Sequence, residues 1–68
     1  MSYFAEKLKK IRKNAGLTMD ALAKASSVSK STICKIEADE VQPTLDVAAR
    51  LSKALGKSLS EMLHEPHP

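Results

Sequence analysis

The side chains best suited to chemistry lie in residues 30–35, which carry two amines, hydroxyls and a thiol. Lys30 precedes Cys34 by four residues, so a helix would place both on one side. Ser31 and Lys35 have the same spacing. Lysine ammonium groups donate to guanine O6 and N7, serine hydroxyls suit several base edges, and a small apolar group can contact a thymine methyl. This side could therefore read bases in a DNA major groove, although an ordinary amphipathic helix with a solvated side accounts for the pattern equally well.

The residues before this segment predict a first helix that could brace it. Apolar residues recur at intervals of three and four, which is typical of a helix with one buried side. Ser2 is expected to cap this helix, and Gly16, which tolerates left-handed dihedrals, is expected to end it. The residues predicted to face inward are Phe4, Leu8, Ile11 and Ala15.

A second helix is predicted to begin after Thr18 and to reach about Ala25. Thr18 has a hydroxyl suited to the N-cap, and Asp20 would lie in the first turn, near the positive end of the helix dipole. Leu22 and Ala23 would form the inner side. This helix is therefore expected to pack against the third.

Residues 26–29 form a short polar turn, after which Ser29 caps a third helix that reaches Glu37. Val28 is expected to fill the core between the two helices. If Ser27 needs a positive φ, a non-glycine residue costs on the order of 1 kcal/mol there. The inward residues of the third helix are Ile33 and Ile36.

The second half of the chain predicts two more helices. Residues 38–43 read as a loop, because the residue before a proline avoids helical dihedrals. Thr44 would cap a fourth helix that Gly56 stops, and Ser58 with Glu61 forms a capping box for a short fifth helix. The apolar residues of the fourth helix are Leu45, Ala48, Ala49, Leu51 and Leu55, and those of the fifth are Leu59, Met62 and Leu63. The prediction is an all-α domain over residues 1–63, followed by a flexible tail over residues 64–68.

Composition supports one small helical domain with a basic first half. The 68 residues are 43% hydrophobic but only 3% aromatic, so aliphatic side chains must build the core. Residues 1–37 carry eight Lys or Arg and three Asp or Glu, a balance of +5, whereas residues 38–68 carry three and five, a balance of −2. A basic half suits a polyanionic partner, although a solvated basic surface is also common.

Other function classes find little support. Cys34 is the single cysteine, which fits a reducing compartment, and no signal peptide or membrane span is evident, so a cytoplasmic location is expected. No nucleophile–base set and no phosphate-binding glycine loop occurs, so we expect no enzyme, cofactor or small-molecule ligand. His64 and His67 with Glu65 are too few and too poorly fixed for a metal site. Cys34 could sense redox state, but a small side chain tolerated on a groove-facing side is the simpler interpretation.

With the whole chain in view, a distributed pattern over residues 4–63 resembles the lambda-repressor-like helix-turn-helix family, and within it the Xre/Cro-type regulators. The pattern comprises Leu17-Thr18, Leu22-Ala23, Val28-Ser29, Thr32-Ile33, Ile36-Glu37, Pro43, Ala54-Leu55-Gly56, Leu59 and Met62-Leu63. The resemblance implies a compact five-helix domain in which the second and third helices form the helix-turn-helix and the third reads DNA. It further implies a sequence-specific transcriptional regulator, a repressor in our interpretation, bound to a palindromic operator as a homodimer.

The resemblance also assigns roles to individual positions. Base reading falls to Lys30, Ser31, Lys35 and Cys34, and contacts with the DNA backbone fall to Thr18, Met19, Ser29, Lys24 and Gln42. A buried structural ion pair would join Arg12 to Glu37. Leu59, Met62 and Leu63 are either core residues or part of a dimer interface.

Two departures from the family pattern favour an alternative function. Met19 stands where glutamine is usual, so only its backbone amide could contact a phosphate. Asp39 and Glu40 occupy a loop where relatives often carry glycine and a basic residue, and anions near phosphates lower affinity. The alternative is a protein-interaction or antitoxin-like module that keeps the fold with weak or no DNA binding.

Overall fold

Five helices make up the computed structural model, which describes residues 3–64. The helices are α1 (Tyr3–Asn14), α2 (Met19–Ser26), α3 (Lys30–Glu37), α4 (Leu45–Ala54) and α5 (Leu59–Leu63). No strand occurs within residues 3–64, which confirms the predicted all-α class. The expected cap at Ser2 and the tail from residue 65 onward lie outside the described residues.

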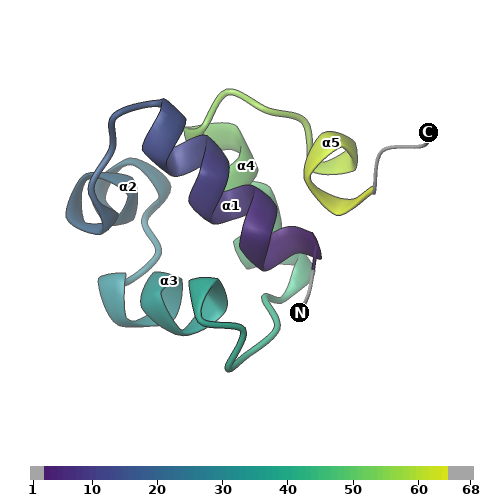
Figure 1. Ribbon diagram of the computed structural model, residues 1–68, viewed down its shortest axis with the longest axis horizontal. Coiled ribbons are helices and arrows are strands. Elements are labelled where there is room, and N and C mark those ends of the chain that lie inside the picture. Colours follow the sequence, from purple (N-terminus) through teal and green to yellow (C-terminus); the bar gives the residue numbers. More distant parts are fainter. Residues whose placement is uncertain (1–2, 65–68) are drawn as a thin grey trace.

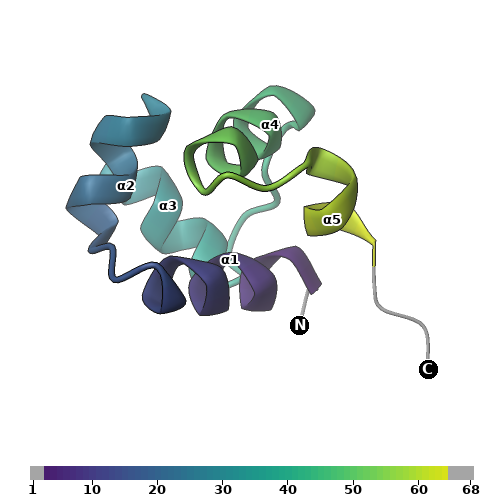
Figure 2. The ribbon, with the colours of Figure 1, turned by 90° about the horizontal axis from the view of Figure 1, so that it is seen from above.

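The arrangement places α2 and α3 next to each other at one end and α5 at the other (Figure 1). α1 packs against both α3 and α5, and α4 packs against α2 and α5 (Figure 2). α1 and α4 therefore act as the support on which the α2–turn–α3 unit is held. None of the described helices has the length and apolar character needed to cross a membrane.

Hydroxyl side chains begin four of the helices, as the sequence predicts. Thr18 Oγ1 accepts from Ala21 N at 3.1 Å, and Ser29 Oγ accepts from Thr32 N at 3.1 Å. Thr44 caps α4, and Ser58 forms the complete capping box with Glu61. Each such cap stabilises a helix by about 0.5–2 kcal/mol, because it satisfies an amide with no partner inside the helix.

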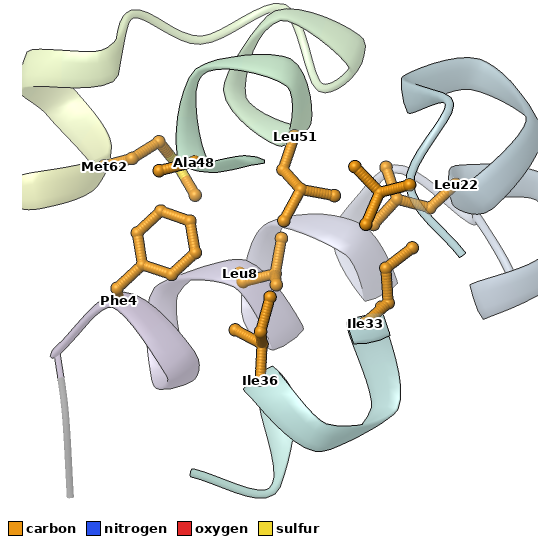
Figure 3. Close-up of a cluster of buried hydrophobic side chains, with 9 residues drawn as sticks. Phe4, Leu8, Leu22, Ile33, Ile36, Ala48, Leu51 and Met62 are labelled. Carbon is orange, nitrogen blue, oxygen red and sulfur yellow. The ribbon is translucent and has the colours of Figure 1, made fainter. Parts of the chain in front are cut away.

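One apolar core joins all five helices. In Figure 3, side chains from α1, α2, α3, α4 and α5 converge around Leu8. The buried cluster contains Phe4, Leu8, Leu22, Val28, Ile33, Ile36, Ala48, Leu51 and Met62. Val28 lies in this cluster, so the turn between α2 and α3 is anchored from inside as predicted.

Ala15, which was expected to face inward, is exposed instead, and so are two apolar residues of α4. Ala15 lies beyond the last residue of α1, so the helical spacing no longer determines where it points. Leu45 is 68% exposed, and Ala49, one turn later, is exposed too. The inner side of α4 follows Ala48 and Leu51, and Leu45 and Ala49 lie outside that stripe. The prediction for Ala15 was wrong because the helix ends before it, and Leu45 and Ala49 show that an apolar residue type alone does not settle which side of a short helix is buried.

Within residues 3–64, two non-glycine residues adopt left-handed backbone conformations. Ser27 ends α2 with φ at 60°, and Asp39 follows α3 with φ at 61°. Ser27 therefore has the positive φ that was considered from the sequence, and this conformation costs on the order of 1 kcal/mol for a residue with a Cβ.

Candidate nucleic-acid interface

The outer side of α3 presents its polar side chains to solvent. Ile33 and Ile36 are 0% and 1% exposed and fix the inner side of the helix in the core. The four residues predicted to read bases are all exposed on this same helix: Lys30, Ser31, Cys34 and Lys35. The structure therefore brings these four positions together on one accessible helix.

Lys30 has a partner that the sequence analysis did not assign. Its Nζ lies 3.3 Å from Oδ2 of Asp20, which stands in the first turn of α2. The sequence contains a hint of this pair, because an acidic residue lies in the first turn of one helix and a basic residue lies in the first turn of the next. Only the angle between α2 and α3 brings those two first turns within ion-pair distance.

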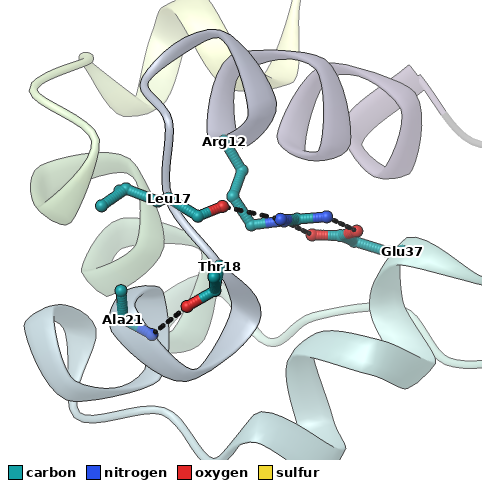
Figure 4. A network of polar contacts seen from close by, with 5 residues as sticks. All are labelled: Arg12, Leu17, Thr18, Ala21 and Glu37. Atoms are coloured by element: carbon teal, nitrogen blue, oxygen red, sulfur yellow. Dashed lines mark hydrogen bonds and ion pairs between the residues drawn. The ribbon is translucent and has the colours of Figure 1, made fainter.

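The hydroxyl groups near the helix starts differ in what they can still bind. Thr18 is exposed, and among the described residues its oxygen accepts one hydrogen bond, the cap bond drawn in Figure 4. The hydroxyl hydrogen of Thr18 can therefore donate to a partner. Ser29 Oγ accepts from Thr32 N and also donates to Thr32 Oγ1 at 2.8 Å. The Ser29 hydrogen is therefore engaged within the helix cap. The hydroxyl of Thr32 accepts in this pair, so its own hydrogen can still donate to another group. No DNA role was predicted for Thr32.

The remaining predicted backbone contacts fall into two groups. Lys24 and Gln42 are exposed. The Met19 side chain is half-buried and packs against the core cluster, and its thioether has no hydrogen to donate. Its backbone amide, at the first position of α2, is the only group that it can offer.

Arg12 and Glu37, which the sequence analysis paired, meet in a buried ion pair. Arg12 Nε and Nη2 donate to the two carboxylate oxygens of Glu37 at 2.7 and 3.0 Å. Arg12 Nη1 donates to the carbonyl oxygen of Leu17 at 2.8 Å, so three segments converge on one guanidinium (Figure 4). The hydrogen bond to Glu37 raises the pKa of Arg12, although desolvation by burial opposes that effect. The guanidinium thus joins α1, the approach to α2 and the end of α3.

The three candidate dimer residues are in different environments. Met62 is 0% exposed and belongs to the core, so it is not available to a partner in this conformation. Leu59 is half-buried against the same cluster. Leu63 is 43% exposed, and of the three it alone offers an open apolar surface.

The acidic loop lies directly after α3. Asp39 N donates to Ile36 O and Glu40 N donates to Lys35 O, so the last turn of α3 fixes the start of the loop. Asp39 is half-buried and Glu40 is exposed. The exposed charge of Glu40 therefore lies at the end of α3 opposite to Lys30.

No group of three His, Cys, Asp or Glu side chains is placed to hold a metal ion within residues 3–64. His64 Nδ1 lies 3.2 Å from Ser60 Oγ, and the candidate ligands Glu65 and His67 lie outside the described residues.

Comparison with known proteins gives consistent matches over most of the chain. The chain is 38% identical over 61 residues to the HTH-type transcriptional regulator PuuR of Escherichia coli (strain K12), and these residues are 90% of this chain and 33% of that protein. It is 39% identical over 46 residues to an uncharacterized HTH-type transcriptional regulator of Methanothermobacter thermautotrophicus, covering 68% of this chain and 67% of that one.

A solved structure agrees with these sequence matches. The fold superposes with a TM-score of 0.86 on an HTH_3 family transcriptional regulator from Vibrio cholerae, which is 36% identical. The match covers 90% of this chain and 34% of that chain. This chain therefore spans about a third of the length of PuuR and of the solved regulator.

The matched proteins are named as transcriptional regulators, the class that the residue pattern predicts. The helix-turn-helix family model HTH_3 matches residues 8–62, which include the whole α2–turn–α3 unit. The five-helix architecture confirms the lambda-repressor-like fold predicted from the residue pattern. This chain belongs to the HTH_3 helix-turn-helix family.

Proposed function

We propose that this chain is a sequence-specific DNA-binding transcriptional regulator in which α3 enters the major groove. One observation carries the proposal: α3 is anchored by Ile33 and Ile36 while its polar side chains stand exposed. A helix reads base edges only when a neighbouring helix braces it and its outer side carries hydrogen-bonding groups. The α2–α3 unit meets both requirements, and the family relationship supports the same function.

Roles for individual residues follow from their positions on the two helices. Lys30, Ser31, Cys34 and Lys35 face base edges, with the lysines as donors to guanine and Cys34 as a small contact for a thymine methyl. The exposed polar groups of Thr18, Lys24 and Gln42 contact phosphates, together with the first amides of α2. The Ser29–Thr32 hydroxyl pair adds one donor beside the start of α3.

The chain is further proposed to act as a homodimer that represses transcription by covering a promoter. A two-fold dimer would bind a palindromic operator with half-sites about 34 Å apart, one turn of B-form DNA. The exposed Leu63 on α5 and the half-buried Leu59 are the candidates for the contact with the second copy.

Selection of duplexes from a random pool tests the proposal and reports the site, its symmetry and the stoichiometry together. Lys35→Ala should relax discrimination at one base position per half-site. If this substitution weakens binding to selected and random duplexes equally, Lys35 contacts phosphate and not a base.

A second function has its own support in the molecule. Met19 offers no side-chain donor, and Glu40 places a negative charge beside the end of α3. These features favour a protein-interaction or antitoxin-like module. Failure of the chain to bind random duplex at 50 mM salt would support that module, because non-specific binding is strongest at low salt.

A further inference from the structure

An ion pair on the molecular surface connects the two helices of the helix-turn-helix. Lys30 Nζ and Asp20 Oδ2 are 3.3 Å apart, with the side chains 58% and 70% exposed. Lys30 is the first residue of α3, and Asp20 is the second residue of α2. The pair therefore joins the first turn of the reading helix to the first turn of its supporting helix; the two helices lie next to each other in Figure 2.

The two lysines of α3 differ in this respect. Lys30 is held by Asp20, whereas Lys35 forms no ion pair within residues 3–64. Non-specific DNA binding comes mainly from cations that neutralise phosphates. Lys35 can serve in that way on any sequence, but the charge of Lys30 is offset by a carboxylate beside it.

The pair leaves Lys30 able to recognise a base. A lysine ammonium group has three donors, and one of them is directed at Asp20. The other two suffice for O6 and N7 of a guanine, the commonest acceptors for a lysine in the major groove. A carboxylate that holds the ammonium therefore favours a sequence with acceptors at that point and disfavours loose contacts with phosphates elsewhere.

We propose that Asp20 is a specificity-determining residue, which holds Lys30 for one base position and weakens binding to every other sequence. This inference rests on the proposed DNA-binding function. Asp20 contacts no base itself. It acts by positioning Lys30 for the selected base and by placing a negative charge beside it, which offsets the attraction of Lys30 to phosphates on every other sequence.

Asp20→Asn tests the proposal, because it removes the charge and keeps the size of the side chain. The matched control is Asp46→Asn on α4, where an equally exposed Asp46 pairs with Arg50 at 3.1 Å, outside α2 and α3. Binding is measured at several salt concentrations to a random-sequence duplex and to the duplex that the unaltered chain selects from a random pool. Thermal unfolding of each variant shows whether the fold is intact.

The Asp20→Asn variant should bind the random duplex roughly threefold more tightly at low salt, because Lys30 is then able to neutralise a phosphate. A plot of the logarithm of its binding constant against the logarithm of the salt concentration should be steeper by about 0.9, the value for one more phosphate contact. The ratio of selected to random affinity should fall roughly tenfold, as for the loss of one oriented base contact. A selection repeated with Asp20→Asn should lose preference at the same base position as Lys30→Ala. Preference at the position read by Lys35 should remain, and Asp46→Asn should change none of these quantities.

Three results would overturn the proposal. If Asp20→Asn and Asp46→Asn have the same affinities for both duplexes while the unaltered chain binds normally, Asp20 has no role in specificity. The proposed function would then still stand. Equal weakening of selected and random binding by Asp20→Asn shows only a general role in support of α2. Absence of any DNA binding by the unaltered chain removes both the proposed function and this inference.

Discussion

Arg12 and Glu37 are 25 positions apart in the chain, yet they form a two-point ion pair with N–O distances of 2.7 and 3.0 Å. The same guanidinium also binds the carbonyl of Leu17, just before the cap of α2. One side chain of α1 thus links both helices of the helix-turn-helix to the support beneath them. A buried ion pair is weak evidence for net stability, but the loss of one partner leaves an unpaired charge.

Removal of Arg12 or Glu37 should destabilise the domain strongly. Arg12→Met or Glu37→Leu should lower the free energy of unfolding by about 3–5 kcal/mol, because each leaves the other charge buried without a partner. Urea unfolding followed by circular dichroism measures this loss. Arg50→Met is the control, since Arg50 and Asp46 are exposed, and its effect should stay below about 1 kcal/mol. The Arg12→Met/Glu37→Leu double variant should recover much of the stability, because it leaves no unpaired buried charge. Near-equal losses for Arg12→Met and Arg50→Met would show that the buried pair has no special role.

The contribution of Arg12 to stability should not vary with pH in the neutral and mildly basic range. Hydrogen bonding to Glu37 raises the pKa of Arg12 above its ordinary value. A raised pKa gives stability that is fully present below the unfolded value and is lost only as pH rises through the folded value. The unfolding difference between the unaltered chain and Arg12→Met should therefore be constant from about pH 7 to pH 10. A marked decline across that interval would contradict this assignment.

Ser27→Gly should stabilise the domain by about 0.5–1 kcal/mol. Ser27 has φ at 60°, where a Cβ is disfavoured and glycine is not. Thermal and urea unfolding provide the measurement. Ala25→Gly, inside α2, is the control and should destabilise by about 0.5–1 kcal/mol, since glycine is a poor helix former. The explanation from backbone strain fails if both substitutions destabilise alike.

Glu40→Gln should strengthen DNA binding at low salt. Glu40 is exposed and fixed to the end of α3 by its backbone hydrogen bond to Lys35 O. Loss of the charge removes repulsion from phosphates, and the gain should shrink as salt rises. Titrations of a random duplex at 50 and 200 mM salt measure it, with Asp46→Asn as the matched change of charge. An unchanged affinity would place the loop away from the duplex.

Met62 and Leu63 are adjacent but should respond differently to substitution. Met62→Ala should destabilise the domain by about 2–5 kcal/mol, because Met62 is fully buried in the core. Leu63→Glu should leave the free energy of monomer unfolding nearly unchanged and should weaken self-association, because Leu63 is exposed. Urea unfolding measures the change in stability, and sedimentation equilibrium measures the change in self-association. An unaltered association for Leu63→Glu would exclude this residue from the dimer contact.

Local residue chemistry was enough to predict most of the secondary structure. Thr18, Ser29, Thr44 and Ser58 each cap a helix as expected, because a cap needs only a hydroxyl and an amide three residues away. The outer side of α3 was also predictable, since Ile33 and Ile36 define its inner side by their spacing. The sequence therefore determined the helices, their order and the residues that α3 exposes.

Contacts between helices depended on the tertiary structure. The proximity of Asp20 to Lys30, the burial of Met62 and the exposure of Leu45 all follow from the angles at which the helices pack. Periodicity within one short helix leaves those angles open, because several packings bury a similar apolar area. The sequence by itself determined a helix with a polar reading side. Only the packed structure decided which of its lysines is held by a neighbouring carboxylate, because that contact joins two elements whose relative orientation the core sets.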